Sequence, residues 1–283
     1  MGRGSEKDDR ATYDKFAALL SPPTQGQSRH RSNSEIADGM KRIRRLILTD
    51  GIPEVEGRPS LRPRIWKLLL RVEQLHAEDY LRYVALGPSP ASEKINHDTF
   101  RTLRTDAVFK DRVKNDMLVR VLDAYEWKHA VNDRQSYVQG MNALAAPFLY
   151  IMPSELEAFA CFAAMMERGC PQYVQPDLRG VHRGVEILDR CLRIVDPELH
   201  AHLESRDLKA TVFAFPSVLT MCACTPPLDE VLQLWDPMKV LRQFPPLQAR
   251  AVIGITVALV KDIPEDLYRE LVAHPLQPSN NQY

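Results

Sequence analysis

The chain has 283 residues, of which 45% are apolar and 26% are charged, so it can bury one large hydrophobic core or two small ones. Its 37 basic residues balance its 37 acidic ones, which excludes a strongly basic nucleic-acid-binding protein. The five cysteines include no C-x-x-C pair, so neither a disulfide framework nor a zinc ribbon is indicated.

The first 31 residues are polar and interrupted by proline, apart from a short apolar segment at 16–20. This composition predicts a disordered N-terminal tail over residues 1–31. The start of the chain also lacks the apolar core of a secretory signal peptide. We therefore expect a soluble, cytoplasmic protein.

Order is expected to begin at Ser32, which has the capping-box spacing to Glu35. Apolar residues then recur at helical spacing from Ile36 to Ile47, which predicts one buried helix face. The basic residues at 41–45 fall on the other faces. They are interpreted as a solvated surface, with contact to an acidic partner as the alternative.

Further helical patterns follow, separated by proline and glycine. They cover 64–72, 79–86, 109–129, 140–151, 155–167, 178–195, 197–205, 228–235, 247–262 and 265–271. Strand signals are nearly absent, because no sustained alternation of β-branched residues occurs. Nor does any apolar run approach the roughly 20 residues of a membrane span, so no membrane insertion is expected. The sequence predicts an all-α fold, a compact array of many short helices.

Common enzyme signatures are missing. The sequence contains no phosphate-binding loop, no dinucleotide-binding glycine motif, no H-E-x-x-H and no nucleophile elbow. His200 and His202 point to different faces of a helix, which argues against a metal site there. We therefore expect no cofactor and no small-molecule chemistry carried out by this chain alone.

Two polar clusters at helix edges are the candidates for a functional site. Ile95, Asp98 and Arg101 are three residues apart and share one face of a helix or turn, so Asp98 can hold the guanidinium of Arg101. The alternative is that Asp98 and Arg101 form an ordinary surface ion pair, which contributes little to stability. In the second cluster Gln139 precedes Gly140, whose missing Cβ allows another molecule to approach the backbone closely.

Together with Arg62 and Trp66 upstream, these clusters resemble the three signature motifs of the TBC domain. That family comprises GTPase-activating proteins for Rab-type small GTPases. The arginine motif I-x-x-D-x-x-R is at residues 95–101, and the glutamine motif Y-x-Q-G-M begins at Tyr137. The resemblance covers roughly residues 46–236.

The resemblance implies a TBC domain over residues 32–273 and a polar tail over 274–283. Family members usually continue with one or two apolar helices after the position of Asp236, whereas here the chain runs straight into Pro237. We therefore expect a shortened C-terminal lobe.

In mechanism, the resemblance implies that two side chains enter the nucleotide pocket of a partner GTPase that carries GTP and Mg²⁺. Arg101 would neutralise charge developing on the phosphoryl oxygens, and Gln139 would orient the attacking water in place of the GTPase's own glutamine. Arg104, one turn beyond Arg101, is the alternative finger, but the motif spacing favours Arg101.

The remaining motif residues have supporting roles under the same resemblance. Asp98 would orient Arg101, while Tyr137 and Gly140 would shape the glutamine loop. Arg62 and Trp66 would be scaffold residues behind the site, with Trp66 in the core.

Within the family, the segments 98–103, 136–159 and 226–236 are most similar to the fungal subunit that restrains mitotic exit and septation together with a scaffold partner. This similarity implies a companion scaffold subunit, and it names the spindle pole body as a candidate location. The alternative function is that of a non-catalytic TBC scaffold, which binds a GTPase or checkpoint partner without stimulating hydrolysis.

Overall fold

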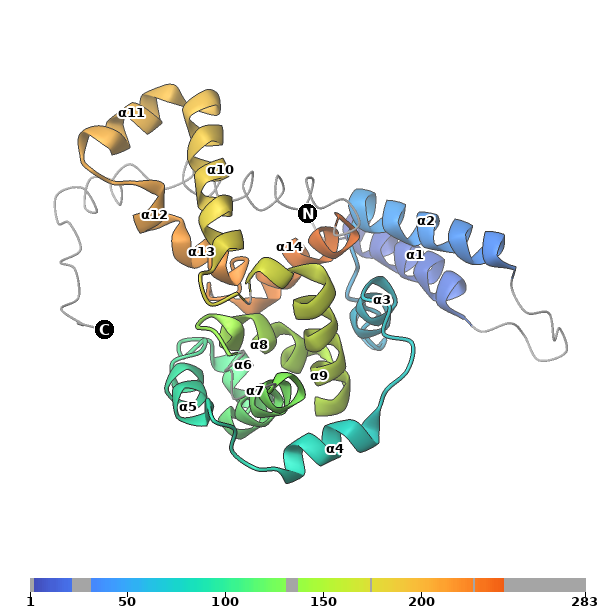
Figure 1. Cartoon of the computed structure of the whole chain (residues 1–283). Coiled ribbons are helices and arrows are strands. Elements are labelled where there is room, and N and C mark those ends of the chain that lie inside the picture. The colour runs from blue at the N-terminus through green and yellow to red at the C-terminus, as the bar shows by residue number, and fades with distance from the viewer. Residues whose placement is uncertain (1–2, 22–31, 131–136, 174, 226, 242–283) are drawn as a thin grey trace, which may run out of the picture.

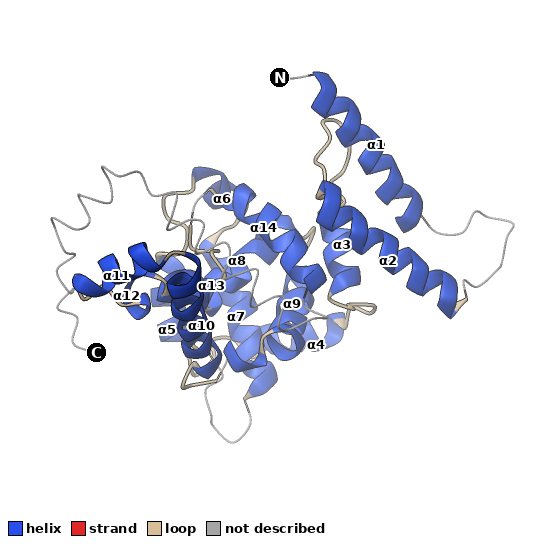
Figure 2. Ribbon diagram, turned by 90° about the horizontal axis from the view of Figure 1, so that it is seen from above, coloured by secondary structure: helices blue, strands red, loops and turns tan. Residues whose placement is uncertain are grey.

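The computed structural model describes residues 3–21, 32–130, 137–173, 175–225 and 227–241. All regular structure in these ranges is helical (Figures 1 and 2), which confirms the predicted all-α fold. The α-helices are α1 (Arg3–Leu20), α2 (Asn33–Asp50), α3 (Arg62–Leu69), α4 (Ala77–Ala85), α5 (Ser92–Phe100), α6 (Ala107–Arg112), α7 (Asn115–His129), α8 (Met141–Ile151), α9 (Glu155–Ala164), α10 (Arg179–Val195), α11 (Pro197–Ser205), α12 (Ala210–Phe213), α13 (Phe215–Thr220) and α14 (Leu228–Leu241). A π-helical turn, η1 (Met165–Gly169), and a 3-10 turn, η2 (Pro171–Tyr173), follow α9.

The N-terminal segment differs from the sequence expectation. Residues 3–20 form the helix α1, which lies against α2, so the prediction of a disordered tail is wrong over this range. Phe16 is fully buried, and the hydroxyl of Tyr13 donates to the carbonyl oxygen of Pro59 at 3.0 Å. The short apolar segment at 16–20, within an otherwise polar stretch, supplies the face of α1 that is buried. Residues 22–31 lie outside the described part of the chain.

The start of α2 confirms the predicted capping box. The Ser32 hydroxyl accepts a hydrogen bond from the backbone N–H of Glu35 at 3.2 Å, and the Glu35 carboxylate accepts one from the Ser32 N–H at 2.8 Å. Four later helices, expected at 79–86, 140–151, 178–195 and 197–205, are confirmed within two residues at each end. The helix expected over 109–129 is instead divided, because Val113 and Lys114 adopt extended backbone between α6 and α7.

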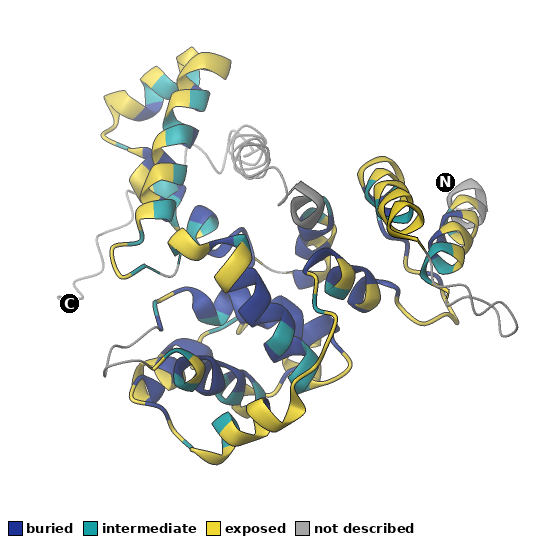
Figure 3. Cartoon of the chain, turned by 45° about the vertical axis from the view of Figure 1, so that its right-hand side comes forward, coloured by how far each residue is buried: buried dark blue, intermediate teal, exposed yellow. Residues whose placement is uncertain are grey.

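The main core lies between α3, α7, α8, α9 and α14, whose buried residues are coloured dark blue in Figure 3. Trp66 stacks on Trp235 with 5.9 Å between ring centroids, and Phe148 meets Trp66 edge-on at 5.6 Å. A smaller core of aliphatic residues holds α10 to α13 together as an arm that projects from this body (Figure 1).

A buried polar cluster ties α3 to α14 inside the main core. The Arg62 guanidinium donates from Nε and Nη2 to the Asp236 carboxylate at 3.0–3.1 Å. Trp66 Nε1 donates to Oδ1 of the same carboxylate at 2.6 Å. The structure therefore places Arg62 and Trp66 in the buried core, and it adds Asp236 as the acceptor that both side chains share.

The last described helix extends further than its sequence pattern predicts. α14 continues through Pro237 to Leu241, whereas the expected helix ends at 235. Buried Trp235 and Asp236 hold the chain helical up to the proline, and the fixed φ of proline is itself compatible with a helix. Three expectations fall outside the described residues and stay predictions. They are the helices at 247–262 and 265–271, the shortened C-terminal lobe and the polar tail at 274–283. None of the helices in the described ranges combines the length and the apolar character of a membrane span.

Candidate functional site

Arg101 lies where α5 ends. Ile95 and Thr99 lie on the buried side of this short helix, and Arg101 is its C-cap residue. The Arg101 side chain is 55% exposed, whereas that of Asp98 is only 4% exposed. Nη2 of Arg101 donates to Oδ1 of Asp98 at 2.7 Å, so a buried carboxylate holds an exposed guanidinium. This confirms the ion pair expected from the i, i+3 spacing.

The other oxygen of Asp98 connects this arginine to the second motif. Oδ2 accepts a hydrogen bond from the hydroxyl of Tyr137 at 2.9 Å. Burial, and secondarily the Asp98 carboxylate, raise the pKa of Tyr137 well above its ordinary value, so the phenol remains a protonated donor. The arginine motif and the glutamine motif therefore meet at one carboxylate.

Two further contacts fix the loop that carries the glutamine motif. The backbone N–H of Tyr137 donates to Oε2 of Glu126, a buried residue of α7, at 2.6 Å. Nδ2 of Asn142 donates to Oγ1 of Thr102 at 2.9 Å. The contacts of Glu126, Asn142 and Thr102 are not predicted by the sequence motifs. The position of Glu126 between the aromatic residues Tyr125 and Trp127 of α7 is the signal that the sequence offers for it.

Gln139 and Gly140 complete the loop before α8. Gln139 is exposed, and its side chain makes no hydrogen bond with the described residues. Gly140 has φ of +98° at the N-cap of α8, and a Cβ added there would lie 2.9 Å from Cγ of Leu219 in α13. Only glycine fits both the left-handed backbone and this close approach, so Gly140 fixes the path of the chain beside Gln139.

The structure brings Arg101 and Tyr137 together on the two oxygens of Asp98. Gln139 follows Tyr137 by two residues in the same loop. It places Arg62 and Trp66 elsewhere, in the core. The guanidinium of Arg104 does not share in the Asp98 interaction but lies over the ring of Phe100, with 5.4 Å to its centroid. Of the two arginines considered, Arg101 is the one that the motif carboxylate orients.

This arrangement has a limited chemical repertoire. A guanidinium and a carboxamide face outward, and neither is a nucleophile or a general base at neutral pH. No grouping of three potential metal ligands occurs among the described residues. What these groups can do is stabilise negative charge and orient a water molecule in a site that a second molecule brings.

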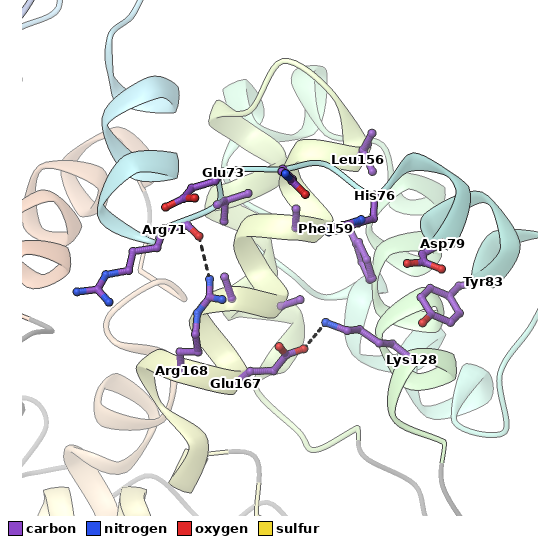
Figure 4. A pocket seen from close by; sticks show the side chains of 15 residues that line it. Arg71, Glu73, His76, Asp79, Tyr83, Lys128, Leu156, Phe159, Glu167 and Arg168 are labelled. Atoms are coloured by element: carbon purple, nitrogen blue, oxygen red, sulfur yellow. Dashed lines mark hydrogen bonds and ion pairs between the residues drawn. The ribbon is translucent and has the colours of Figure 1, made fainter. Parts of the chain in front are cut away.

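A separate cavity of about 580 Å³ opens on another part of the molecule (Figure 4). It lies between the segment after α3, helix α4 and helix α9. Two interactions at its edge are marked in Figure 4: Lys128 pairs with Glu167, and Nη2 of Arg168 donates to the carbonyl oxygen of Arg71 at 3.5 Å. The same Nη2 also donates to the carbonyl oxygen of Leu70 at 2.7 Å. Neither Arg101 nor Gln139 lines this cavity, so it is distinct from the candidate site.

Comparison with known proteins is decisive for the family. The family model described as the Rab-GTPase-TBC domain matches residues 59–267. This chain belongs to the TBC domain family. The matched region of the TBC domain contains both motifs of the candidate site, whereas α1 and α2 precede it.

Relatives of this TBC protein include cell-cycle proteins. The chain is 39% identical to Cell division control protein 16 of Schizosaccharomyces pombe, over 83% of this chain and 88% of that protein. It is 32% identical to Mitotic check point protein BUB2 of Saccharomyces cerevisiae, over 84% of this chain and 92% of that protein. Among solved structures, the Ypt/Rab-GAP domain of Gyp1p matches with a TM-score of 0.65 and 18% identity, covering 96% of this chain and 94% of that domain, which supports the TBC fold.

Proposed function

We propose that this TBC domain protein accelerates GTP hydrolysis by a Rab- or Ras-like small GTPase, with Arg101 and Gln139 inserted into the partner's nucleotide pocket. The observation that carries the proposal is the shared Asp98 carboxylate, which binds Arg101 through one oxygen and Tyr137 through the other. Because of this bridge, the exposed arginine and the loop that bears the exposed glutamine are held as one unit.

Each residue then has a defined task. The Arg101 guanidinium offsets the negative charge that builds up on the transferred phosphoryl group, a contribution of about 10³–10⁵ in rate when an arginine is supplied in trans. The Gln139 carboxamide can accept a hydrogen bond from the attacking water and donate one to a phosphoryl oxygen. GTP and Mg²⁺ belong to the partner, and this chain contributes no cofactor.

The names of the relatives suggest the cellular setting. Cell division control protein 16 and Mitotic check point protein BUB2 are similar to this chain over more than four fifths of its length. We infer a role in controlling mitotic exit and septation, exercised in the cytoplasm and at the spindle pole body, with a companion scaffold subunit.

A single-turnover GTP hydrolysis assay against a panel of Rab-type GTPases tests this function. The variants Arg101→Ala and Gln139→Ala should each lose orders of magnitude of stimulated hydrolysis while the fold is unchanged. Arg82→Ala is the matched control, because Arg82 is also an exposed arginine paired with an aspartate three residues earlier, at 2.8 Å, yet lies on α4. Wild-type-like stimulation by either finger variant would refute the mechanism.

The same assay decides the alternative function. A wild-type protein that binds a GTPase but leaves its hydrolysis rate unchanged, even with the scaffold subunit present, is a non-catalytic TBC scaffold. Binding is measured separately by calorimetry with the GTPase loaded with a non-hydrolysable GTP analogue.

A further inference from the structure

Phe100 is an exception among the aromatic residues. Phe100 is 70% exposed, whereas every other aromatic residue in the described ranges is buried or half-buried. The other large apolar residues exposed in these ranges are aliphatic. Phe100 is also the last residue of α5, directly before Arg101.

The pattern of α5 does not account for this exposure. The buried side of the helix is already filled by Ile95, Asp98 and Thr99. Phe100 extends the opposite face, where the residues one and two turns earlier are the exposed polar residues Asn96 and Glu93. A polar residue at position 100 would therefore complete an ordinary amphipathic helix, and phenylalanine departs from it.

An arginine guanidinium lies against the ring of Phe100. The Arg104 guanidinium lies over its ring, 5.4 Å from the centroid, and His97 is an exposed neighbour on α5. Isolated exposed aliphatic residues are common on protein surfaces, but an exposed aromatic beside arginines has the composition of an interface hot spot.

We propose that Phe100 anchors the partner GTPase by inserting into an apolar depression beside its nucleotide pocket, with Arg104 facing acidic groups around that depression. This inference rests on the proposed function and adds the contact that seats the partner against Arg101. The occupant is the GTP-bound GTPase, because the anchor is covalently adjacent to the residue that must reach the phosphates.

The anchor has a kinetic signature that differs from that of the finger. A contact made equally in the bound complex and in the transition state strengthens binding without accelerating the chemical step. Phe100 should therefore control KM and Kd, whereas Arg101 should control the rate at saturation.

The test compares Phe100→Ala with the wild type in calorimetric binding to Rab-type GTPases loaded with a non-hydrolysable GTP analogue, and in GTP hydrolysis. Truncation of a hot-spot aromatic should raise Kd and KM by about 10- to 100-fold. The rate at saturating activator should stay within about twofold of the wild type. Phe100→Leu, which keeps an apolar side chain, should recover most of the affinity.

Ile194→Ala is the matched control, because Ile194 is an apolar side chain that is 79% exposed on α10. Its truncation should change neither Kd nor KM. An unchanged Kd and KM for Phe100→Ala, while the wild type stimulates hydrolysis, overturns the anchor and leaves the proposed function standing. A loss of saturating rate at constant KM also overturns it, because Phe100 would then act through Arg101.

Failure of the proposed function looks different. If the wild type binds a GTPase without accelerating hydrolysis, the catalytic function fails, and the Kd of Phe100→Ala still decides whether the anchor exists. If the wild type binds none of the GTPases, both ideas are refuted.

Discussion

The hydroxyl of Tyr137 donates a 2.9 Å hydrogen bond to Oδ2 of Asp98, across 39 residues of sequence. Both side chains are buried, so this bond forms in a medium where an unsatisfied carboxylate oxygen is costly. The remaining oxygen of Asp98 is thereby left for Arg101, which reaches it from the surface at 2.7 Å. A residue that never faces the partner thus determines where the exposed guanidinium lies.

Tyr137→Phe should weaken both stability and activity. Removing the hydroxyl leaves a buried carboxylate oxygen without its donor, which should lower the free energy of unfolding by about 1–3 kcal/mol. Displacement of Asp98 and the glutamine loop should lower stimulated GTP hydrolysis by about 10- to 100-fold, because small errors in position are amplified in the rate. Denaturant unfolding and single-turnover hydrolysis measure the two effects.

Tyr150→Phe separates the two effects. The Tyr150 hydroxyl donates to Oδ2 of Asp229 at 3.2 Å, between α8 and α14, in a contact that includes none of the candidate site residues. This variant should lose some stability and keep full stimulation of hydrolysis. Equal activity losses in Tyr137→Phe and Tyr150→Phe would show that Tyr137 contributes only to the fold.

Asp236→Asn should destabilise the domain strongly. The Asp236 carboxylate accepts from the buried Arg62 guanidinium and from Trp66 Nε1, so its loss leaves a cation without a full partner inside the core. Breaking a buried ion pair from one side costs about 3–5 kcal/mol. Thermal and denaturant unfolding measure this loss.

Glu54→Gln is the control on the same guanidinium. Glu54 pairs with Nη1 of Arg62 at 2.5 Å, but its side chain is 51% exposed. Because solvent screens that pair, the variant should cost about 1 kcal/mol or less. Equal losses for Asp236→Asn and Glu54→Gln would contradict the assignment of Asp236 as the central acceptor.

Local spacing was sufficient to predict part of the site. The pairing of Asp98 with Arg101 depends on an i, i+3 relationship within one turn, and the glycine after Gln139 is visible in the sequence itself. The bonds that complete the site span longer separations, such as Glu126 to the backbone of Tyr137. Residue-level patterns carry no information about such contacts, because they are created only when α5, α7 and the loop before α8 come together.

The fold also contains elements that local sequence patterns predict and elements that depend on tertiary contacts. Helices with a complete apolar face, such as α10 and α2, follow from their periodicity. The helix α1 does not, because its overall composition is polar and its stability depends on burying Phe16 against the rest of the protein. Helix propensity alone rarely stabilises a short helix, so tertiary contacts decide such cases. The continuation of α14 through Pro237 is likewise absent from the local pattern, because a proline after Asp236 indicates the end of a helix.

The stability of the domain should depend on pH through Glu167. Burial acts to raise the pKa of Glu167, but hydrogen bonds from His129 and Lys128 outweigh it and lower the pKa from 4.5 to about 2. A carboxyl whose pKa is depressed in the folded state stabilises the fold above its unfolded pKa, and that contribution is lost as the pH falls through the folded value. The wild type should therefore be more stable than Glu167→Gln at pH 7, and the difference should shrink as the pH falls from about 4.5 toward 2.

Thermal unfolding of both proteins from pH 7 to pH 2.5 measures this dependence. Lys128→Met removes one of the two partners, so the stability that Glu167 provides should be lost at a higher pH than in the wild type. A constant stability difference between the wild type and Glu167→Gln across this range would contradict the lowered pKa.

Gly140→Ala should destabilise the glutamine loop for two separable reasons. An alanine at φ of +98° is strained, and its Cβ would lie 2.9 Å from Cγ of Leu219, so the combined cost should be about 2–4 kcal/mol in unfolding free energy. Stimulated hydrolysis should fall as well, because Gln139 precedes the displaced backbone.

Gly39→Ala is the control, since Gly39 lies inside α2 with nothing within 4 Å of an added Cβ. There the change should raise the free energy of unfolding by about 0.5–1 kcal/mol. Adding Leu219→Ala to Gly140→Ala removes the clash but not the backbone strain, so it should recover only part of the activity; no recovery at all would mean that the clash with α13 plays no part.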